Sequence, residues 1–273
     1  MIRAAWPVKA VALLTLVAGT HSALRAQEAG SAPETKAPAP TQTAAPAPQA
    51  GVPHHPDNDY WRKHDQQLMT DFGWLARFKE EDSKVGPPAA GENRVVFMGD
   101  SITEGWHLGD SFPGKPYINR GISGQTTPQM LVRFRQDVIA LKPKVVVILG
   151  GTNDIAGNTG PETLEEIEDN LASMADLARS NGIRVVLCSI MPAFDYAWAP
   201  GMAPAEKIVT VNKWMKAYAA DHGDVYVDFH TAMKDERDGL PKTLSPDGVH
   251  PTAAGHAVMA PLVQAGIDQA LAK

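Results

Sequence analysis

The sequence has a single cysteine, no long hydrophobic run and no excess of basic residues, and each deficit excludes a class of protein. One cysteine, Cys188, excludes an intrachain disulfide framework and a cysteine-rich zinc site. The apolar run Ala10–Ala18 is too short to cross a bilayer, which needs ~20 residues. The formal charge of −6 argues against nucleic-acid binding, because phosphate contacts need a basic surface.

Residues 1–26 are typical of a secretory signal peptide. Arg3 and Lys9 form a basic start, the apolar run follows, and small residues lead to Ala23 and Ala26. This pattern predicts cleavage near Ala26 and a periplasmic or secreted protein without a stable membrane anchor. A buried N-terminal helix is the alternative interpretation.

Residues 27–56 have the composition of a disordered linker. Of these 30 residues, 8 are Ala and 7 are Pro, and none is aromatic. Such a segment cannot bury enough apolar surface to offset the entropy lost on ordering. The pair His54–His55, followed by Asp57 and Asp59, suggests a metal site at first sight. We interpret it instead as the solvated end of the linker, and we predict no metal or other cofactor.

From residue 57 the pattern becomes that of one α/β domain, residues 57–273. Five short apolar runs are compatible with buried strands: Arg94–Met98, Tyr117–Asn119, Lys144–Leu149, Ile183–Ile190 and Val225–Phe229. Helical spacing predicts helices at 57–82, 127–141, 162–180, 204–221 and 252–272. Strands that alternate with helices imply a parallel sheet covered on both faces. Cys188 falls within the fourth run, so we expect a buried thiol.

The segment 162–180 shows the helical evidence most clearly. Its apolar residues recur at steps of three and four: Leu164, Ile167, Leu171, Met174 and Leu177. Pro161 fits the first helical position and Gly182 fits the end of the helix.

Polar and glycine-rich clusters follow the first three predicted strands, and a fourth precedes the last helix. They read GDSIT at 99–103, NRGISGQTT at 119–127, GGTND at 150–154 and DGVHPTAAGH at 247–256. Function collects at the carboxyl ends of parallel strands, so the first three should share one edge of the sheet. Each cluster alone also fits ordinary turn chemistry. A phosphate-binding loop is the competing interpretation of the second cluster, but the Lys-Ser/Thr pair of that motif is absent.

Residues from these clusters supply what ester hydrolysis requires. The hydroxyl of Ser101 is a poor nucleophile unless a base removes its proton as it attacks. His250 can take that proton and return it to the leaving alcohol, and Asp247 can hold the tautomer of His250. Gly124 lets the backbone approach a ligand closely, and the amide of Asn153 can donate to a developing oxyanion.

The ordered set GDSIT, ISGQTT, GGTND and DGVHP resembles the GDSL or SGNH hydrolase family. The resemblance covers roughly residues 94–273 and implies a flavodoxin-like three-layer α/β/α sandwich with a five-stranded parallel sheet. It implies Ser101 as nucleophile, with Asp247 and His250 completing the triad. It also implies an oxyanion hole formed by the N–H groups of Ser101 and Gly124 and the side chain of Asn153.

Two details qualify the resemblance. Ile102 replaces the leucine that gives GDSL its last letter, which is an aliphatic exchange. The GxSxG elbow of ordinary lipases is absent around Ser101, which argues against the α/β-hydrolase fold. The second and third clusters are also similar to the family's acetylhydrolases that cleave platelet-activating factor.

The substrate is less well specified by the sequence. Trp106 follows the serine cluster, and Tyr196 and Trp198 follow the fourth strand. These rings are candidates to line an acyl pocket or to stack on a sugar, and they fit packing under a surface loop equally well. We expect an esterase for short, acetyl-like esters, with acetylated carbohydrate as one substrate class. A lysophospholipase or thioesterase, or a catalytically inactive binding module, remain the alternatives.

Overall fold

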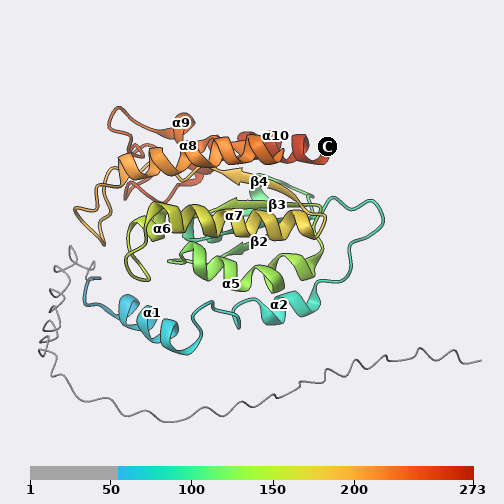
Figure 1. The fold of residues 1–273 in the computed structure, drawn as a ribbon, viewed down its shortest axis with the longest axis horizontal. Helices are drawn as coiled ribbons and strands as arrows, with labels where there is room; N and C mark the ends of the chain where they lie inside the picture. The colour runs from blue at the N-terminus through green and yellow to red at the C-terminus, as the bar shows by residue number, and fades with distance from the viewer. Residues whose placement is uncertain (1–54) are drawn as a thin grey trace, which may run out of the picture. The chain divides into compact units, whose positions relative to one another are not determined.

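The structure, a computed structural model, describes residues 55–273 (Figure 1). The predicted signal peptide and nearly all of the predicted linker lie outside these residues. The strands are β1 (Val95–Gly99), β2 (Tyr117–Gly121), β3 (Val145–Leu149), β4 (Arg184–Cys188) and β5 (Val225–Val227). They form one five-stranded sheet in the order β2-β1-β3-β4-β5, and every neighbouring pair is parallel. The predicted fold class is confirmed.

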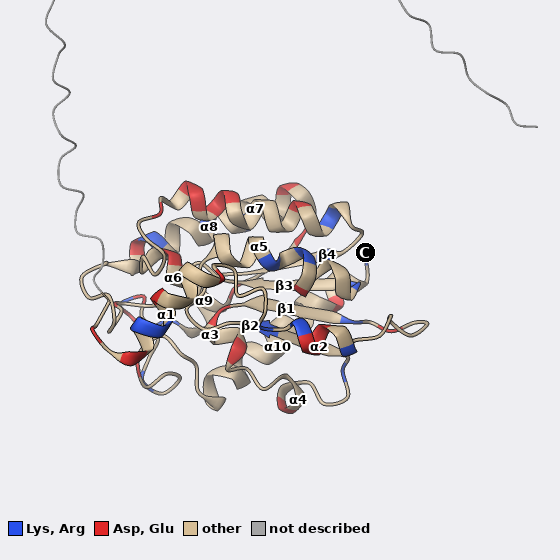
Figure 2. Ribbon diagram, turned by 90° about the horizontal axis from the view of Figure 1, so that it is seen from below, with Lys and Arg blue, Asp and Glu red and all other residues tan. Residues whose placement is uncertain are grey.

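Helices cover both faces of the sheet, because the central strands β1 and β3 are buried at every position and side chains alternate between faces. The longer helices are α5 (Thr127–Asp137), α7 (Leu164–Ser180), α8 (Pro204–His222) and α10 (Ala253–Leu271). Val96 and Met98 pack in the same core as α5, α7 and α8. Val95 and Phe97 point to the other face, toward α10. Figure 2 shows α5 and α7 on one side of the sheet and α10 on the other.

The start of α7 differs from the prediction by two residues. Thr163 is the N-cap, its hydroxyl accepts from the N–H of Glu166, and the Glu166 carboxylate accepts from the N–H of Thr163. This reciprocal capping box stops the helix from extending back to Pro161, which therefore precedes the cap. Gly182 follows the end of the helix with φ +72, as its position predicts.

The predicted helix 57–82 is wrong as a single element. The structure has α1 (Asp59–Thr70) and α2 (Lys79–Lys84), separated by turns. Asp71 ends α1, and its carboxylate accepts from the N–H groups of Leu75 and Ala76. Trp74 adopts φ 53, a left-handed conformation that a helix cannot contain. Apolar spacing alone did not reveal this break.

Three short helices begin just after a strand, and the sequence patterns did not predict them: α3 (Ser101–Glu104), α6 (Thr152–Ile155) and α9 (Phe229–Met233). A fourth short helix, α4 (Leu108–Ser111), lies between α3 and β2, and the 3₁₀ helix η1 (Ile139–Leu141) forms the end of the predicted helix 127–141. Gly99 ends β1 where a Cβ would lie 2.1 Å from Thr103 Oγ1 and 2.7 Å from Leu149 O. Only glycine therefore allows α3 to fold back this closely against the sheet.

An ion pair attaches α2 to the edge strand β2. Nε of Arg120 donates to Asp82 Oδ1 at 2.9 Å, and both side chains are largely buried. The guanidinium also lies 4.6 Å from the ring centre of Phe78, which precedes α2. The segment before β1 is thus packed against the domain and is part of its fold.

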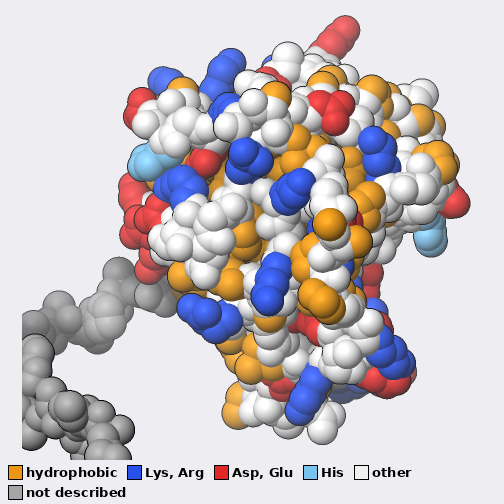
Figure 3. All heavy atoms as spheres, turned by 90° about the vertical axis from the view of Figure 1, so that its right-hand side faces the viewer, with side chains coloured by type: hydrophobic (Ala, Val, Ile, Leu, Met, Phe, Trp, Pro, Cys, Tyr) orange, Lys and Arg blue, Asp and Glu red, His pale blue; other side chains and the backbone are white. Residues whose placement is uncertain are grey.

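The two ends of the sheet differ in charge. Basic residues stand where strands begin, with Arg94 before β1, Lys144 before β3 and Arg184 at the start of β4. Figure 3 views the side of the molecule that lies on the right in Figure 1, and Lys and Arg side chains are spread over it. The polar clusters predicted to carry function lie at the opposite ends of the strands.

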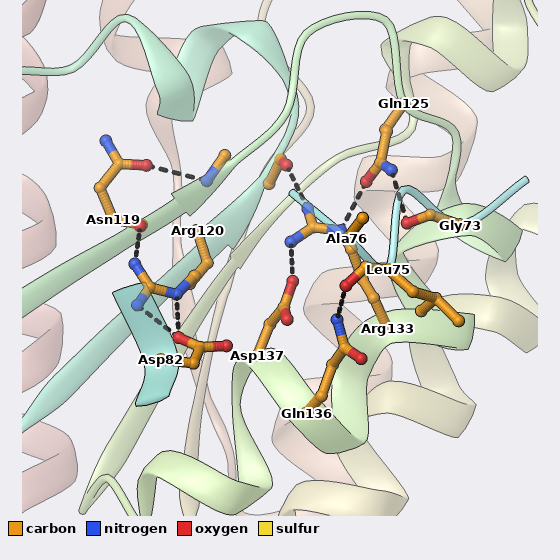
Figure 4. A network of polar contacts seen from close by, with 12 residues as sticks. Gly73, Leu75, Ala76, Asp82, Asn119, Arg120, Gln125, Arg133, Gln136 and Asp137 are labelled. Carbon is orange, nitrogen blue, oxygen red and sulfur yellow. Dashed lines mark hydrogen bonds and ion pairs between the residues drawn. The ribbon is translucent and has the colours of Figure 1, made fainter. Parts of the chain in front are cut away.

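A buried arginine connects the end of β1 to the loop after β2 (Figure 4). Arg133 of α5 donates to Gly99 O at 2.9 Å, to Gln125 Oε1 at 2.6 Å and to Asp137 Oδ2 at 2.9 Å. The Arg133 and Asp137 side chains have no exposed surface. Gln125 in turn donates to Gly73 O at 3.1 Å. Three segments that are distant in the chain therefore depend on one guanidinium.

We predict that Arg133→Met destabilises the fold by roughly 3–5 kcal/mol, because the carboxylate of Asp137 would remain buried without a partner. Chemical denaturation measures this loss. Arg135→Met on the exposed face of α5 is the matched control and should change stability by less than about 0.5 kcal/mol. Equal effects of the two substitutions would contradict the role given to Arg133.

Candidate active site

Ser101 stands at the tip of the turn between β1 and α3. Asp100 is the N-cap of α3, and its Oδ1 accepts from the N–H of Ile102 at 2.9 Å. This places Ser101 in the first turn of the helix with its side chain partly exposed. Its Oγ lies 2.9 Å from Nε2 of His250, which comes from the loop before α10. The two residues are 149 positions apart in the chain.

The other ring nitrogen of His250 faces a carboxylate. Nδ1 of His250 lies 2.7 Å from Asp247 Oδ2. Asp247 Oδ1 accepts from the N–H groups of His250 at 2.8 Å and Val249 at 3.0 Å, and from Ser245 Oγ at 2.9 Å. Burial opposes the charge of Asp247, but these hydrogen bonds hold its pKa well below the usual range. The carboxylate therefore stays ionised beside the imidazole.

Three hydrogen-bond donors are available around the Ser101 hydroxyl. The N–H groups of Ser101 and Gly124 donate no hydrogen bond within residues 55–273. Gly124 has φ +80, and a Cβ there would lie 3.1 Å from Tyr60 Oη, so the position requires glycine. Asn153 follows β3, and its Nδ2 donates to Gln125 O at 2.9 Å. Ser101, Gly124, Asn153 and His250 line one cavity of about 310 Å³.

The topology explains why these residues meet. In the order β2-β1-β3, the chain leaves β1 toward one edge of the sheet and leaves β3 toward the other. A crevice forms outside the carboxyl ends of two strands at such a switch point. Ser101 follows one of these strands and Asn153 follows the other.

Aromatic rings form the walls of the cavity. Tyr60 and Trp61 of α1 line it together with Trp198, which follows β4. Of the three predicted pocket rings, only Trp198 lies at the cavity. Tyr196 is buried behind it, with ring centres 5.0 Å apart, and its hydroxyl bonds to Thr152 Oγ1 at 2.8 Å. Tyr196 thus supports Trp198 from behind rather than facing a ligand.

The prediction that Trp106 lines this cavity is wrong. Trp106 is 2% exposed and belongs to the core on the α10 side of the sheet. Its ring stacks on His256 with centres 5.2 Å apart, and its Nε1 donates to Ser111 Oγ at 2.9 Å. The helix α3 carries the chain away from the cavity between Ser101 and Trp106, which proximity in sequence did not reveal.

His55 also differs from its interpretation as a solvated linker end. Its ring stacks on Trp61 at 3.5 Å between centres and 3° between planes. Its Nε2 lies 3.2 Å from Asn158 O, so the residue is packed beside the cavity. His54 lies outside the described residues. The pair Tyr60–Trp61 directly after the linker was the available signal for a wall, but its spacing also fitted ordinary helix packing.

Burial perturbs a carboxyl group directly behind the nucleophile. The side chain of Asp100 is almost completely buried, and burial raises its pKa to about 7. Asp154, which directly follows the cavity residue Asn153, is also buried. Its Oδ1 accepts from the N–H of Thr127 at the start of α5 at 2.8 Å. Asp154 therefore stabilises the scaffold of the site.

Other candidate chemistries have little support in the described residues. Cys188 is buried in the core, and burial raises the pKa of its thiol. Within residues 55–273, no group of three His, Cys, Asp or Glu side chains is arranged to hold a metal ion. No helix in this part of the chain is long and apolar enough to cross a membrane.

Comparison with known proteins identifies the family. The model of the GDSL-like lipase/acylhydrolase family matches residues 97–258, and the chain belongs to this family. A crystal structure of a GDSL-like lipase from Bacteroides thetaiotaomicron is 41% identical in sequence. The match covers 73% of this chain and 100% of that one, with a TM-score of 0.71. Both findings support the class of carboxylic ester hydrolases.

Two curated relatives are acetylxylan esterases. The protein from Xylanibacter ruminicola is 27% identical over 250 residues, which is 76% of this chain and 48% of the relative. The protein from Geobacillus stearothermophilus is 28% identical over 52% of this chain and 68% of its own length. The chain thus spans about half the length of the first of these relatives.

The raised pKa of Asp100 predicts a pH-dependent stability. The folded state keeps a proton that the unfolded state releases, so stabilisation is complete below about pH 4 and is lost as pH rises to about 7. Asp100→Asn retains the acceptor for Ile102 and removes the titration. Its stability relative to wild type should rise by up to about 1.4 kcal/mol per pH unit across this window. Urea denaturation of both proteins at pH 4 to 8 measures the difference, and a difference that stays constant with pH would contradict the prediction.

Proposed function

We propose that the chain is a serine esterase that hydrolyses short-acyl carboxylic esters through Ser101, His250 and Asp247. The observation that carries the proposal is the continuous hydrogen-bonded series from Ser101 Oγ through both ring nitrogens of His250 to Asp247. This arrangement gives a hydroxyl the base it needs and fixes the tautomer of that base.

In the first half of the reaction, Ser101 Oγ attacks the ester carbonyl carbon while His250 Nε2 takes its proton. The carbonyl oxygen becomes negative and accepts from the N–H groups of Ser101 and Gly124 and from Asn153 Nδ2. Asp247 stabilises the imidazolium that forms. When the tetrahedral species collapses, the C–O bond to the alcohol breaks, and His250 returns the proton to the departing oxygen.

In the second half, a water molecule replaces the alcohol. His250 takes a proton from the water, whose oxygen attacks the acyl carbon and forms a second tetrahedral species with the same donors. Its collapse releases the carboxylic acid and returns the proton to Ser101 Oγ. The protein groups used in this sequence are Ser101, His250 and Asp247 together with the donors of Gly124 and Asn153.

The cavity supports a small acyl group. Its volume of about 310 Å³ lies at the lower end of the range for ligand pockets. Trp61 is buried and stacked on His55, and Trp198 is backed by Tyr196. Because both walls are supported from behind, we propose that they do not yield to a long acyl chain.

The similarity to two acetylxylan esterases supports acetylated carbohydrate as the natural ester. A lysophospholipase or thioesterase is the second candidate, and the similarity to esterase TesA of Pseudomonas aeruginosa, 28% identical over 60% of this chain, supports an esterase without separating the two candidates. The leader-like residues 1–26 support a periplasmic or secreted location, where polymeric substrates are accessible. A panel of acetylated xylo-oligosaccharides and lysophospholipids distinguishes the two substrates.

We predict that Ser101→Ala lowers kcat for p-nitrophenyl acetate by ~10⁴-fold or more, because no other group replaces the nucleophile. A fluorophosphonate probe should label Ser101 in the wild type and nothing in the variant. Ser83→Ala, at an exposed site on α2, is the control and should keep full activity. Retained activity in the Ser101 variant, or labelling of a different serine, would show that the nucleophile is misassigned.

Replacing Trp61 of the cavity wall by a smaller residue should allow longer acyl chains to bind. We predict that Trp61→Ala raises kcat/KM for p-nitrophenyl propionate relative to acetate by roughly tenfold, since one added methylene is worth about 1–3 kcal/mol in an apolar pocket. Phe72→Ala, on an exposed ring of the same segment, should leave the ratio unchanged. An unaltered ratio in the Trp61 variant would show that this wall does not determine the acyl-chain selectivity.

A further inference from the structure

Asn158 makes hydrogen bonds to three residues that line the cavity. Its Nδ2 donates to Gly124 O at 3.1 Å and to Asn153 Oδ1 at 3.0 Å. Its Oδ1 accepts from Trp198 Nε1 at 3.0 Å. The residue is 4% exposed and follows α6 in a loop. Both N–H groups and the oxygen of the amide therefore have partners, as a buried amide requires.

The indole of Trp198 determines which way the Asn158 amide points. An indole N–H can only donate, so it must face the oxygen of Asn158 and not the NH₂ group. The NH₂ group is then directed at two acceptors, Gly124 O and Asn153 Oδ1. Each of these belongs to a residue that supplies a donor to the proposed oxyanion hole.

The second amide is oriented by the first. Because Asn153 Oδ1 accepts from Asn158, its own Nδ2 is directed to Gln125 O at 2.9 Å and lies 3.5 Å from Asp100 Oδ2, and Asn153 lines the cavity. Without Asn158, a rotation by half a turn would exchange the two ends of the Asn153 amide. The site would then present a lone pair to the developing negative oxygen in place of an N–H, and the attraction would become a repulsion.

We propose that Asn158 is a positioning residue for the oxyanion hole, orienting the Asn153 amide and the Gly124 peptide through a hydrogen bond from Trp198. The proposal rests on the esterase function proposed above. Asn158 does not exchange a proton with the ester. It acts by determining which atoms of its neighbours face the reacting carbonyl oxygen.

Substitution of Asn158 should reproduce the loss of an oxyanion donor. We expect Asn158→Ala to lower kcat by ~10²-fold, with KM changed less than about threefold. Asn158→Asp should cost at least as much, because a carboxylate oxygen would face Gly124 O and Asn153 Oδ1. Trp198→Phe keeps a ring and removes the N–H, and should lower kcat by roughly three- to tenfold. Asn181→Ala, an exposed asparagine after α7, is the matched control with unchanged kcat.

A double-mutant cycle separates positioning from general support of the fold. In an Asn153→Ala background, the residue that Asn158 orients is gone, so Asn158→Ala should cost less than about tenfold instead of ~10²-fold. Independent structural damage would multiply the two losses. Multiplying losses, or an Asn158→Ala variant with kcat within threefold of wild type, would overturn the proposal.

Two further measurements keep the outcomes distinct. If Asn158→Ala does not fold, as judged by circular dichroism, Trp198→Phe carries the test through its kcat, and an unchanged kcat in that variant overturns the proposal. If Ser101→Ala retains activity, the proposed function itself fails. A loss of kcat confined to the Asn158 and Trp198 variants, with Ser101 labelled normally, supports the positioning role.

Discussion

The candidate site depends on one buried guanidinium. Arg133 donates to the carbonyl of Gly99, two residues before the serine, and to the side chain of Gln125, in the loop that carries Gly124. The backbone carbonyl of Gln125 then accepts from Asn153. A charge taken out of water is tolerated only when it is paired and hydrogen-bonded, so this arrangement has little freedom to shift. Segments after β1, β2 and β3 are thereby held in one geometry.

Closer to the cavity, the site is organised by groups that can act only as hydrogen-bond donors or only as acceptors. An indole N–H donates, a carbonyl oxygen accepts, and the amides between them must orient accordingly. Trp198, Asn158 and Asn153 form such a series. The carboxylate of Asp247, next to His250, is also held by its surroundings, since four hydrogen bonds favour its ionised form. Preorganised dipoles of this kind need no rearrangement when negative charge develops, which is the main source of electrostatic catalysis.

Much of the architecture could be predicted from the sequence because it has a periodic signal. Strands β1, β3 and β4 appear as aliphatic runs, and α7, α8 and α10 appear as apolar spacing. The break between α1 and α2 could not be predicted in this way, since it depends on the carboxylate of Asp71 and the left-handed backbone of Trp74. The short helices after the strands are likewise too brief to show a period.

The residues of the site likewise differ in whether the sequence could predict them. Ser101, Asp247 and His250 stand in motifs at strand or loop ends, and the structure brings their side chains together. Asn158 carries no local signal, and the spacing of Tyr60 and Trp61 fits ordinary helix packing, because the importance of all three lies in contacts with residues far along the chain. Trp106 shows the converse error, since a ring five residues after the serine is turned into the core by a single helical turn.

The origin of the aromatic wall has a consequence for how selectivity can change. Tyr60 and Trp61 precede residues 97–258, which match the family model, whereas Ser101, Asn153 and His250 lie within them. Chemistry and one side of the cavity are thus encoded in separate stretches of the gene. Variation in the amino-terminal segment can therefore reshape this wall, provided that it preserves the carbonyl of Gly73 and the carboxylate of Asp82 that bind Gln125 and Arg120.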